Sequence, residues 1–120
     1  MTLKYAARLP LLALMAIFVS ASAAQAVDCN AIHQVNITFE FVPGDIYLAP
    51  GDCVRFTNIH HIEHSAIGME REFNTGVLMP NNSAVHRFNE EIAIPYVCGV
   101  HPLMVGVIVV EEPEDDSAVQ

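Results

Sequence analysis

Short segments that alternate apolar and polar residues most constrain what this chain can fold into. A period of two is typical of strands that bury one face, and turn residues such as Pro43-Gly44-Asp45 and Pro50-Gly51-Asp52 separate the first of these segments. Residues 58–64 form a histidine-rich loop, and residues 68–83 show no clear period. The expected strands are residues 35–41, 46–48, 53–57, 84–88, 92–97 and 105–110. Because no segment has a helical period of useful length, the pattern predicts an all-β sandwich or barrel.

The first 26 residues have the composition of a secretory signal peptide rather than of a folded segment. Lys4 and Arg8 give a basic start, residues 9–19 are apolar almost throughout, and Ala24-Gln25-Ala26 matches a cleavage site. The apolar run is short for a membrane span, although an uncleaved membrane anchor is the alternative. We therefore expect residues 1–26 to be a signal peptide that is cleaved near Ala26, and a periplasmic location.

The 120 residues suffice for one domain, which we expect at residues 27–112, followed by an acidic, flexible tail at residues 113–120. After residue 26 the chain keeps three arginines and all fourteen acidic residues, so this part has a net charge of −11. Such a charge argues against a nucleic-acid partner, because proteins bind phosphates through lysine and arginine. It is compatible with a basic partner protein, or simply with solubility.

The chain contains three cysteines, Cys29, Cys53 and Cys98. An odd number means that one of them lies outside any intramolecular bridge. Cys98 lies among other metal-binding residue types, so Cys29 and Cys53 are the expected disulfide pair, provided that their two strands run side by side and parallel. Two free buried thiols are the alternative. In the chain-entropy model, such a bridge contributes about 3 kcal/mol to stability.

Cys98, His101 and Met104 bring a thiol, an imidazole and a thioether together within seven residues, just before the last apolar segment. Together these donors suit copper that cycles between two oxidation states. The alternative is a buried cysteine, a histidine at the rim and a methionine in the core. A trigonal copper site needs a second imidazole from elsewhere in the chain. The candidates are His33, His60, His61, His64 and His86.

With these residues in view, the sequence resembles the cupredoxins, the small blue-copper proteins, and in particular plastocyanins and amicyanins. The segments Phe41-Val42-Pro43 and 50–58 resemble the family's strand, turn and strand before the first histidine ligand. In plastocyanins that ligand stands six residues after an asparagine like Asn58, and here this position is His64. Residues 98–110 are similar to the ligand loop of amicyanins, in which two residues also separate histidine from methionine.

The resemblance implies a Greek-key β-sandwich or barrel of about seven or eight strands that binds one copper ion. The implied ligands are His64, Cys98, His101 and Met104, the last of these as a long axial ligand. The remaining histidines of the loop and of residues 84–88, His60, His61 and His86, would then have surface or packing roles. Azurins, another branch of the family, carry a disulfide at the positions that correspond to Cys29 and Cys53.

The implied activity is electron transfer by a monomer to a redox protein, such as a c-type cytochrome or a periplasmic dehydrogenase, rather than catalysis. Electrons would leave through His101. An apolar docking patch of Val100, Pro102 and Leu103, extended by Met79 and Pro80, would surround it, although these residues also suit ordinary surface and core packing.

Two features depart from the family pattern. Ser65 follows the first histidine where asparagine commonly braces the ligand loop, and Gly99-Val100 replaces a frequent pair of a hydroxyl residue and proline. These departures predict a less braced ligand loop. We also expect a backbone N–H near the sulfur of Cys98, from the residue after Asn58, to tune the reduction potential.

Two other functions compete with electron transfer. A copper-binding module for delivery or resistance would use the additional histidines His60 and His61 together with several methionines. A copper enzyme of this superfamily usually needs a second metal site and further domains, so a single short domain argues against it.

Overall fold

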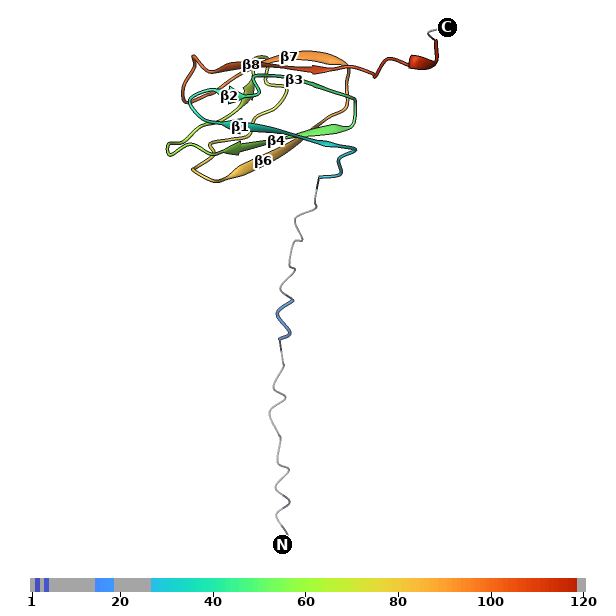
Figure 1. The fold of residues 1–120 in the computed structure, drawn as a ribbon. Helices are drawn as coiled ribbons and strands as arrows, with labels where there is room; N and C mark the ends of the chain where they lie inside the picture. Colours follow the sequence, from blue (N-terminus) through green and yellow to red (C-terminus); the bar gives the residue numbers. More distant parts are fainter. Residues whose placement is uncertain (1, 3, 5–14, 19–26, 119–120) are drawn as a thin grey trace.

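The chain folds into two packed β-sheets, which the computed structural model describes for residues 2, 4, 15–18 and 27–118 (Figure 1). Most of the predicted signal peptide lies outside the described residues. The strands are β1 (Ile32–Ile37), β2 (Phe41–Val42), β3 (Asp45–Leu48), β4 (Asp52–Asn58), β5 (Ile67–Gly68), β6 (Ser83–Phe88), β7 (Ile92–Val97) and β8 (Val105–Val110). The predicted all-β fold is confirmed, and the strands expected at 92–97 and 105–110 have the expected bounds.

One predicted strand is divided in the structure. The alternation at residues 35–41 was expected to form a single strand, whereas β1 begins at Ile32 and ends at Ile37. Thr38 then turns the chain by donating its backbone N–H to the carbonyl oxygen of Glu40 at 2.9 Å. Phe41 therefore returns beside Ile37 in an antiparallel pair, and the apolar alternation continues across the turn.

The two sheets have the strand orders β2-β1-β4-β6 and β3-β8-β7-β5. The pairs β1–β4 and β3–β8 are parallel, and the other pairs are antiparallel. Parallel pairs cannot be joined by a tight hairpin, so the chain crosses between the sheets after β2 and again after β3. This crossing makes the fold a sandwich rather than a simple meander.

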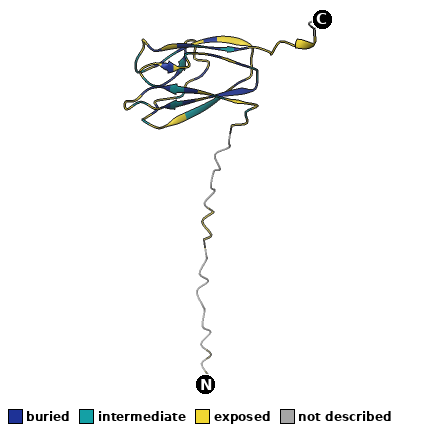
Figure 2. Cartoon of the chain, viewed as in Figure 1, coloured by how far each residue is buried: buried dark blue, intermediate teal, exposed yellow. Residues whose placement is uncertain are grey.

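The core fills the space between the sheets with inward-facing residues of the strands other than β5, and with residues of the loops such as Phe73 and Leu78 (Figure 2). Phe56 lies at its centre, stacked on Phe73 at 5.4 Å between ring centroids and edge-on to Tyr96 at 5.7 Å. Buried residues alternate with more exposed ones along β3 and β8 and from Ala93 onward in β7, as the period of two requires. A further close approach occurs at Gly106, where a Cβ would collide with the carbonyl oxygen of Gly44 and with the ring of Tyr96.

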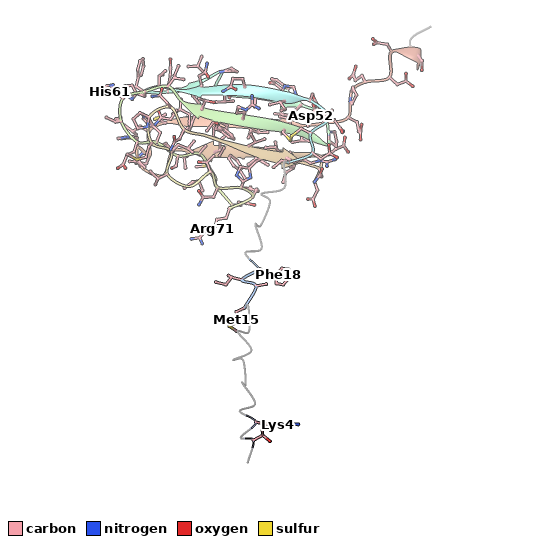
Figure 3. The ribbon with its side chains drawn as sticks, turned by 90° about the horizontal axis from the view of Figure 1, so that it is seen from below. Lys4, Met15, Phe18, Asp52, His61 and Arg71 are labelled. Atoms are coloured by element: carbon pink, nitrogen blue, oxygen red, sulfur yellow. A yellow bond between two sulfur atoms is a disulfide. The ribbon has the colours of Figure 1, made fainter. Side chains whose placement is uncertain are left out.

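The disulfide between Cys29 and Cys53 is present, with 5.5 Å between the Cα atoms. It joins the segment before β1 to the beginning of β4, and Ile32 lies opposite Cys53 in the parallel pair. The structure thus confirms the pairing and the parallel arrangement on which it depended. The bridge lies at the end of the sandwich that carries Asp52, opposite the end that carries His61 (Figure 3).

After β8, the chain leaves the sandwich and extends to residue 118, the last described residue (Figure 1). The predicted acidic tail contains a short 3₁₀ helix at Asp116–Ala118, which exposed residues precede. Among the described residues, no helix is long and apolar enough to cross a membrane.

Candidate metal centre

Two loops at one end of the sandwich bring the predicted ligands together. The loop after β4 carries His64, and the loop between β7 and β8 carries Cys98, His101 and Met104. Because β4 and β7 belong to different sheets, the two loops approach each other across the end of the core (Figure 1). Residues 34 positions apart in the sequence therefore face one another.

The backbone of His64 is held by a pair of hydrogen bonds to the backbone of Leu78. The N–H of His64 donates to the carbonyl oxygen of Leu78 at 3.1 Å, and the N–H of Leu78 donates back at 2.7 Å. Asn58, which is fully buried, donates its side-chain amide to the carbonyl oxygens of Ile62 and Leu78, each at 2.8 Å. These bonds satisfy the buried polar groups and fix the histidine-rich loop against residues 78–82.

The β7–β8 loop is a tight turn closed by its own backbone. The N–H of Cys98 donates to the carbonyl oxygen of Met104, and the N–H of Met104 donates to that of His101, both at 3.1 Å. Cys98 is fully buried, Met104 is buried just before β8, and His101 is half-buried. The spacing of two residues between successive donors thus places all three in one turn.

Cys98 and His64 face each other, with 3.8 Å between Sγ and Nδ1. The ring of His101 lies beside the ring of His64, with 4.9 Å between the centroids. The Nε2 atom of His101 is buried and lacks a hydrogen-bond partner among the described residues. A buried imidazole nitrogen without a partner is costly unless a ligand satisfies it.

Burial lowers the pKa of His64, and positive charge on His101, His60 and His61 would lower it further. The neutral imidazole is therefore the favoured form of His64 in the folded protein. Only that form can donate a lone pair to a metal.

The sulfur of Cys98 accepts two backbone hydrogen bonds, from the N–H of Ser65 and the N–H of His101, both at 3.4 Å. The expectation that the residue after Asn58 would supply this N–H is wrong. The N–H of that residue, Ile59, donates instead to the carbonyl oxygen of Ile37 at 3.0 Å, because Ile59 continues the β1–β4 ladder.

Ser65 braces the ligand loop, contrary to the expectation from its departure from asparagine. Its buried Oγ accepts the N–H of Gly99 at 2.8 Å, which ties the residue after His64 to the residue after Cys98. The hydroxyl of serine is shorter than an asparagine amide, and the glycine lets the two backbones come close enough. A Cβ at Gly99 would lie only 3.0 Å from this Oγ.

Three of the other histidines have different surroundings. His33 bonds to Asp52 at 2.9 Å at the opposite end of the sandwich, and Nε2 of His86 lies 3.1 Å from the carbonyl oxygen of Asn74. His61 is exposed beside His60, with 4.2 Å between the ring centroids. His60 does more than pack at the surface, because its Nδ1 lies 2.9 Å from Nε2 of His64.

No family model and no curated relative match the chain. Solved structures do match its fold. A purple cupredoxin from Nitrosopumilus maritimus is 24% identical with a TM-score of 0.62, and the match covers 65% of this chain and 98% of that one. A mutant amicyanin in the reduced state is 25% identical with a TM-score of 0.59, covering 68% and 83%. A copper-containing nitrite reductase from Thermus scotoductus is 24% identical with a TM-score of 0.63, covering 78% of this chain but only 25% of the enzyme.

The chain has a cupredoxin-like fold. The predicted resemblance and fold class are thus confirmed, and the match covers 98% of the purple cupredoxin and 83% of the amicyanin.

Within this cupredoxin-like fold, no group of three or more His, Cys, Asp or Glu side chains is arranged to hold a metal ion among the described residues. The predicted donors nevertheless lie at one end: the imidazole of His64 faces the thiol of Cys98 and lies beside the ring of His101. Met104, which carries a thioether, is buried in the same turn as Cys98. Such a set could hold a transition metal with soft character.

An open hollow of about 430 Å³ lies against His101 on the outside of the cupredoxin-like sandwich. Its lining is mostly apolar and includes Val100, Met79 and Pro80 from the expected docking patch. The other two residues of that patch, Pro102 and Leu103, are exposed beside His101 in the sequence and do not line the hollow.

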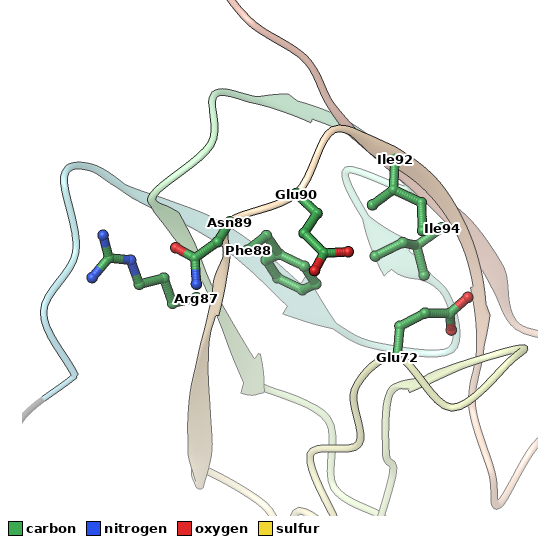
Figure 4. A pocket seen from close by; sticks show the side chains of 7 residues that line it. All are labelled: Glu72, Arg87, Phe88, Asn89, Glu90, Ile92 and Ile94. Atoms are coloured by element: carbon green, nitrogen blue, oxygen red, sulfur yellow. The ribbon is translucent and has the colours of Figure 1, made fainter.

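A second hollow, of about 320 Å³, lies near the turn between β6 and β7 (Figure 4). Two carboxylates, one guanidinium and one amide line it together with three apolar side chains. The lining residues are Glu72, Arg87, Phe88, Asn89, Glu90, Ile92 and Ile94. None of the four predicted ligands is among them, so it is separate from the candidate metal centre.

Proposed function

We propose that the protein carries one electron at a time on a single copper ion held by His64, Cys98, His101 and Met104. The observation that supports this most directly is the convergence of Cys98 Sγ and His64 Nδ1 at 3.8 Å, beside a buried and unpartnered nitrogen of His101. Thiolate, imidazole and thioether donors are the set found in blue-copper sites, so these residues fit copper.

Bound copper would supply one-electron chemistry between Cu(I) and Cu(II). The chain itself would supply a thiolate at Cys98, whose charge the N–H groups of Ser65 and His101 partly offset. The Ser65–Gly99 hydrogen bond and the two backbone hydrogen bonds between His64 and Leu78 would hold the two loops in one arrangement in both oxidation states. A fixed arrangement keeps the reorganisation that accompanies electron transfer small.

The hollow against His101 supports this imidazole as the route of the electron to a partner. Apolar surface around a half-buried ligand would let a redox protein approach the site closely. We propose the patch of Val100, Pro102 and Leu103 for this docking, with a c-type cytochrome or a dehydrogenase as partner. The strongly acidic chain would favour a partner with a basic surface.

We further propose that the protein acts in the periplasm as a monomer after cleavage of residues 1–26, with residues 27–112 as its domain. The disulfide supports an oxidising compartment, because such bridges rarely persist in the cytosol.

The decisive experiment is to load purified protein with copper and record its absorption and redox behaviour. We expect an intense blue thiolate-to-copper band and reversible reduction, with the band absent in Cys98→Ala. His64→Ala should perturb the band far more than His61→Ala, because His61 is exposed and serves as the matched control. A colourless protein that readily releases copper would refute electron transfer and favour a role in copper delivery. A damaging effect of His61→Ala would show that the ligand assignment is wrong.

A further inference from the structure

His60 contacts the candidate ligand His64 from outside the donor set. Nδ1 of His60 lies 2.9 Å from Nε2 of His64, and the two rings are 5.1 Å apart with planes tilted by 30°. This distance is that of a good hydrogen bond between ring nitrogens. The loop position of His60 had suggested only a surface or packing role.

We propose that His60 is a positioning residue that holds His64 in the tautomer able to bind a metal through Nδ1. This inference deepens the proposed function and rests on it. A neutral imidazole has one N–H and one lone pair, so a proton on Nε2 of His64 leaves Nδ1 free. That free nitrogen is the one that faces Cys98 Sγ at 3.8 Å.

The direction of the hydrogen bond decides the chemistry. When His64 donates from Nε2 and His60 accepts at Nδ1, the proton of His60 sits on its own Nε2. The reverse direction would place a proton on Nδ1 of His64, between that ring and Cys98, and would block coordination there. The partner of the ring nitrogen that does not bind the metal thus selects the tautomer of a histidine ligand.

His60 is itself held in place to accept this bond. Its backbone N–H donates to Oδ1 of Asn58 at 2.9 Å, and Asn58 is fully buried and bonded on both sides of its amide. The ring of His61 packs edge-on against it at 4.2 Å. The backbone of His60 is therefore held by the same asparagine that fixes the loop around His64, and its ring packs against His61.

The two candidate imidazole ligands differ in this respect. Nε2 of His64 has a protein partner in His60, whereas the buried Nε2 of His101 has none among the described residues and stays free for a ligand. Donation of an N–H to His60 increases the electron density on His64, which favours Cu(II) over Cu(I). Loss of His60 should therefore weaken Cu(II) binding more than Cu(I) binding and raise the reduction potential.

The first test is nitrogen NMR of the metal-free protein, in which long-range proton–nitrogen spectra assign the tautomer of each histidine. We expect His64 as the Nε2–H form in the wild type and in His60→Asn, because the amide Oδ1 can replace the accepting nitrogen. In His60→Ala we expect a mixture of the two tautomers, and in the control His61→Ala no change. A proton on Nδ1 of His64 in the wild type, or an unchanged spectrum in His60→Ala, overturns the proposal.

The second test is titration with copper alone. We expect His60→Ala to lose about tenfold in Cu(II) affinity with little change in Cu(I) affinity, which equals a reduction potential about 59 mV higher. His60→Asn should keep most of the Cu(II) affinity of the wild type. Equal affinities in His60→Ala and the wild type overturn the proposal. If the wild type itself binds no copper, the proposed function fails, while the tautomer measurement still decides whether His60 orients His64.

Discussion

Replacement of Ser65 by alanine tests whether one hydroxyl braces the candidate metal centre. The substitution removes a single 2.8 Å bond from the N–H of Gly99 and leaves the backbone bond of residue 65 to Cys98 Sγ in place. Ser65 is only 2% exposed, so water does not fill the position freely, but Gly99 is exposed and its N–H can regain a water partner. We therefore expect a loss of about 1 kcal/mol in the free energy of unfolding.

Thr75 offers a matched control for this substitution. Its Oγ1 accepts the N–H of the buried Ala66 at 2.9 Å, in the same region of the fold. Among the described residues, its side chain makes no hydrogen bond to the β7–β8 loop. Thr75→Val should destabilise the protein by about 1–3 kcal/mol, because it leaves a buried donor unpaired. It should leave the spectrum and potential of copper-loaded protein unchanged.

Urea denaturation of the metal-free variants gives the two stability changes, and voltammetry of the copper-loaded variants gives the potentials. We expect Ser65→Ala to alter both stability and potential, and Thr75→Val to alter stability alone. If Ser65→Ala is as stable as the wild type, or if both variants shift the potential equally, Ser65 does not brace the centre.

Three further predictions concern the scaffold. In urea denaturation, the double variant Cys29→Ala/Cys53→Ala should have a free energy of unfolding about 3 kcal/mol lower than the wild type, because the bridge closes a loop between residues 24 positions apart. A loss below about 1 kcal/mol would contradict the chain-entropy argument. The hydrogen bond to His33 lowers the pKa of Asp52 below 3.8, so Asp52→Asn should reduce the free energy of unfolding by about 1 kcal/mol above that pH. This difference from the wild type should shrink as the pH falls through the lowered pKa, because the wild-type carboxylate then becomes protonated. A difference that grows in acid would refute the assignment. Gly106→Ala should lower the free energy of unfolding, measured by thermal denaturation, by about 1–3 kcal/mol, because its Cβ would collide with the carbonyl oxygen of Gly44 and the ring of Tyr96. An unchanged stability would show that the strands can move apart.

Local patterns were sufficient for much of the fold. Alternation and, at residues 105–110, an apolar run located six strand segments, because the direction of side chains along a strand is set by backbone geometry and does not depend on the partner strand. It failed at residues 35–41, where the alternation passes through a turn and so resembles one strand. It also gave no sign of β5, whose two residues pair with β7 only because the folded loop delivers them there.

The donors Cys98, His101 and Met104 could be read from the sequence because one short loop carries all three. Residues a few positions apart must stay close in any fold, so their spacing already limits their geometry. His64 required the resemblance to cupredoxins, since five histidines were equally possible from composition alone. The structure places it 3.8 Å from Cys98, while His33 and His86 bond elsewhere.

The sequence by itself determined the alternating strands, the donor loop and the pair of cysteines available for a bridge. Only the tertiary structure decided that Ser65 accepts the N–H of Gly99, that the sulfur of Cys98 receives its N–H from Ser65 and not from Ile59, and that His60 meets His64. These contacts join segments from different sheets or depend on how a loop closes. Their directions are set by packing across the core, which no local pattern encodes.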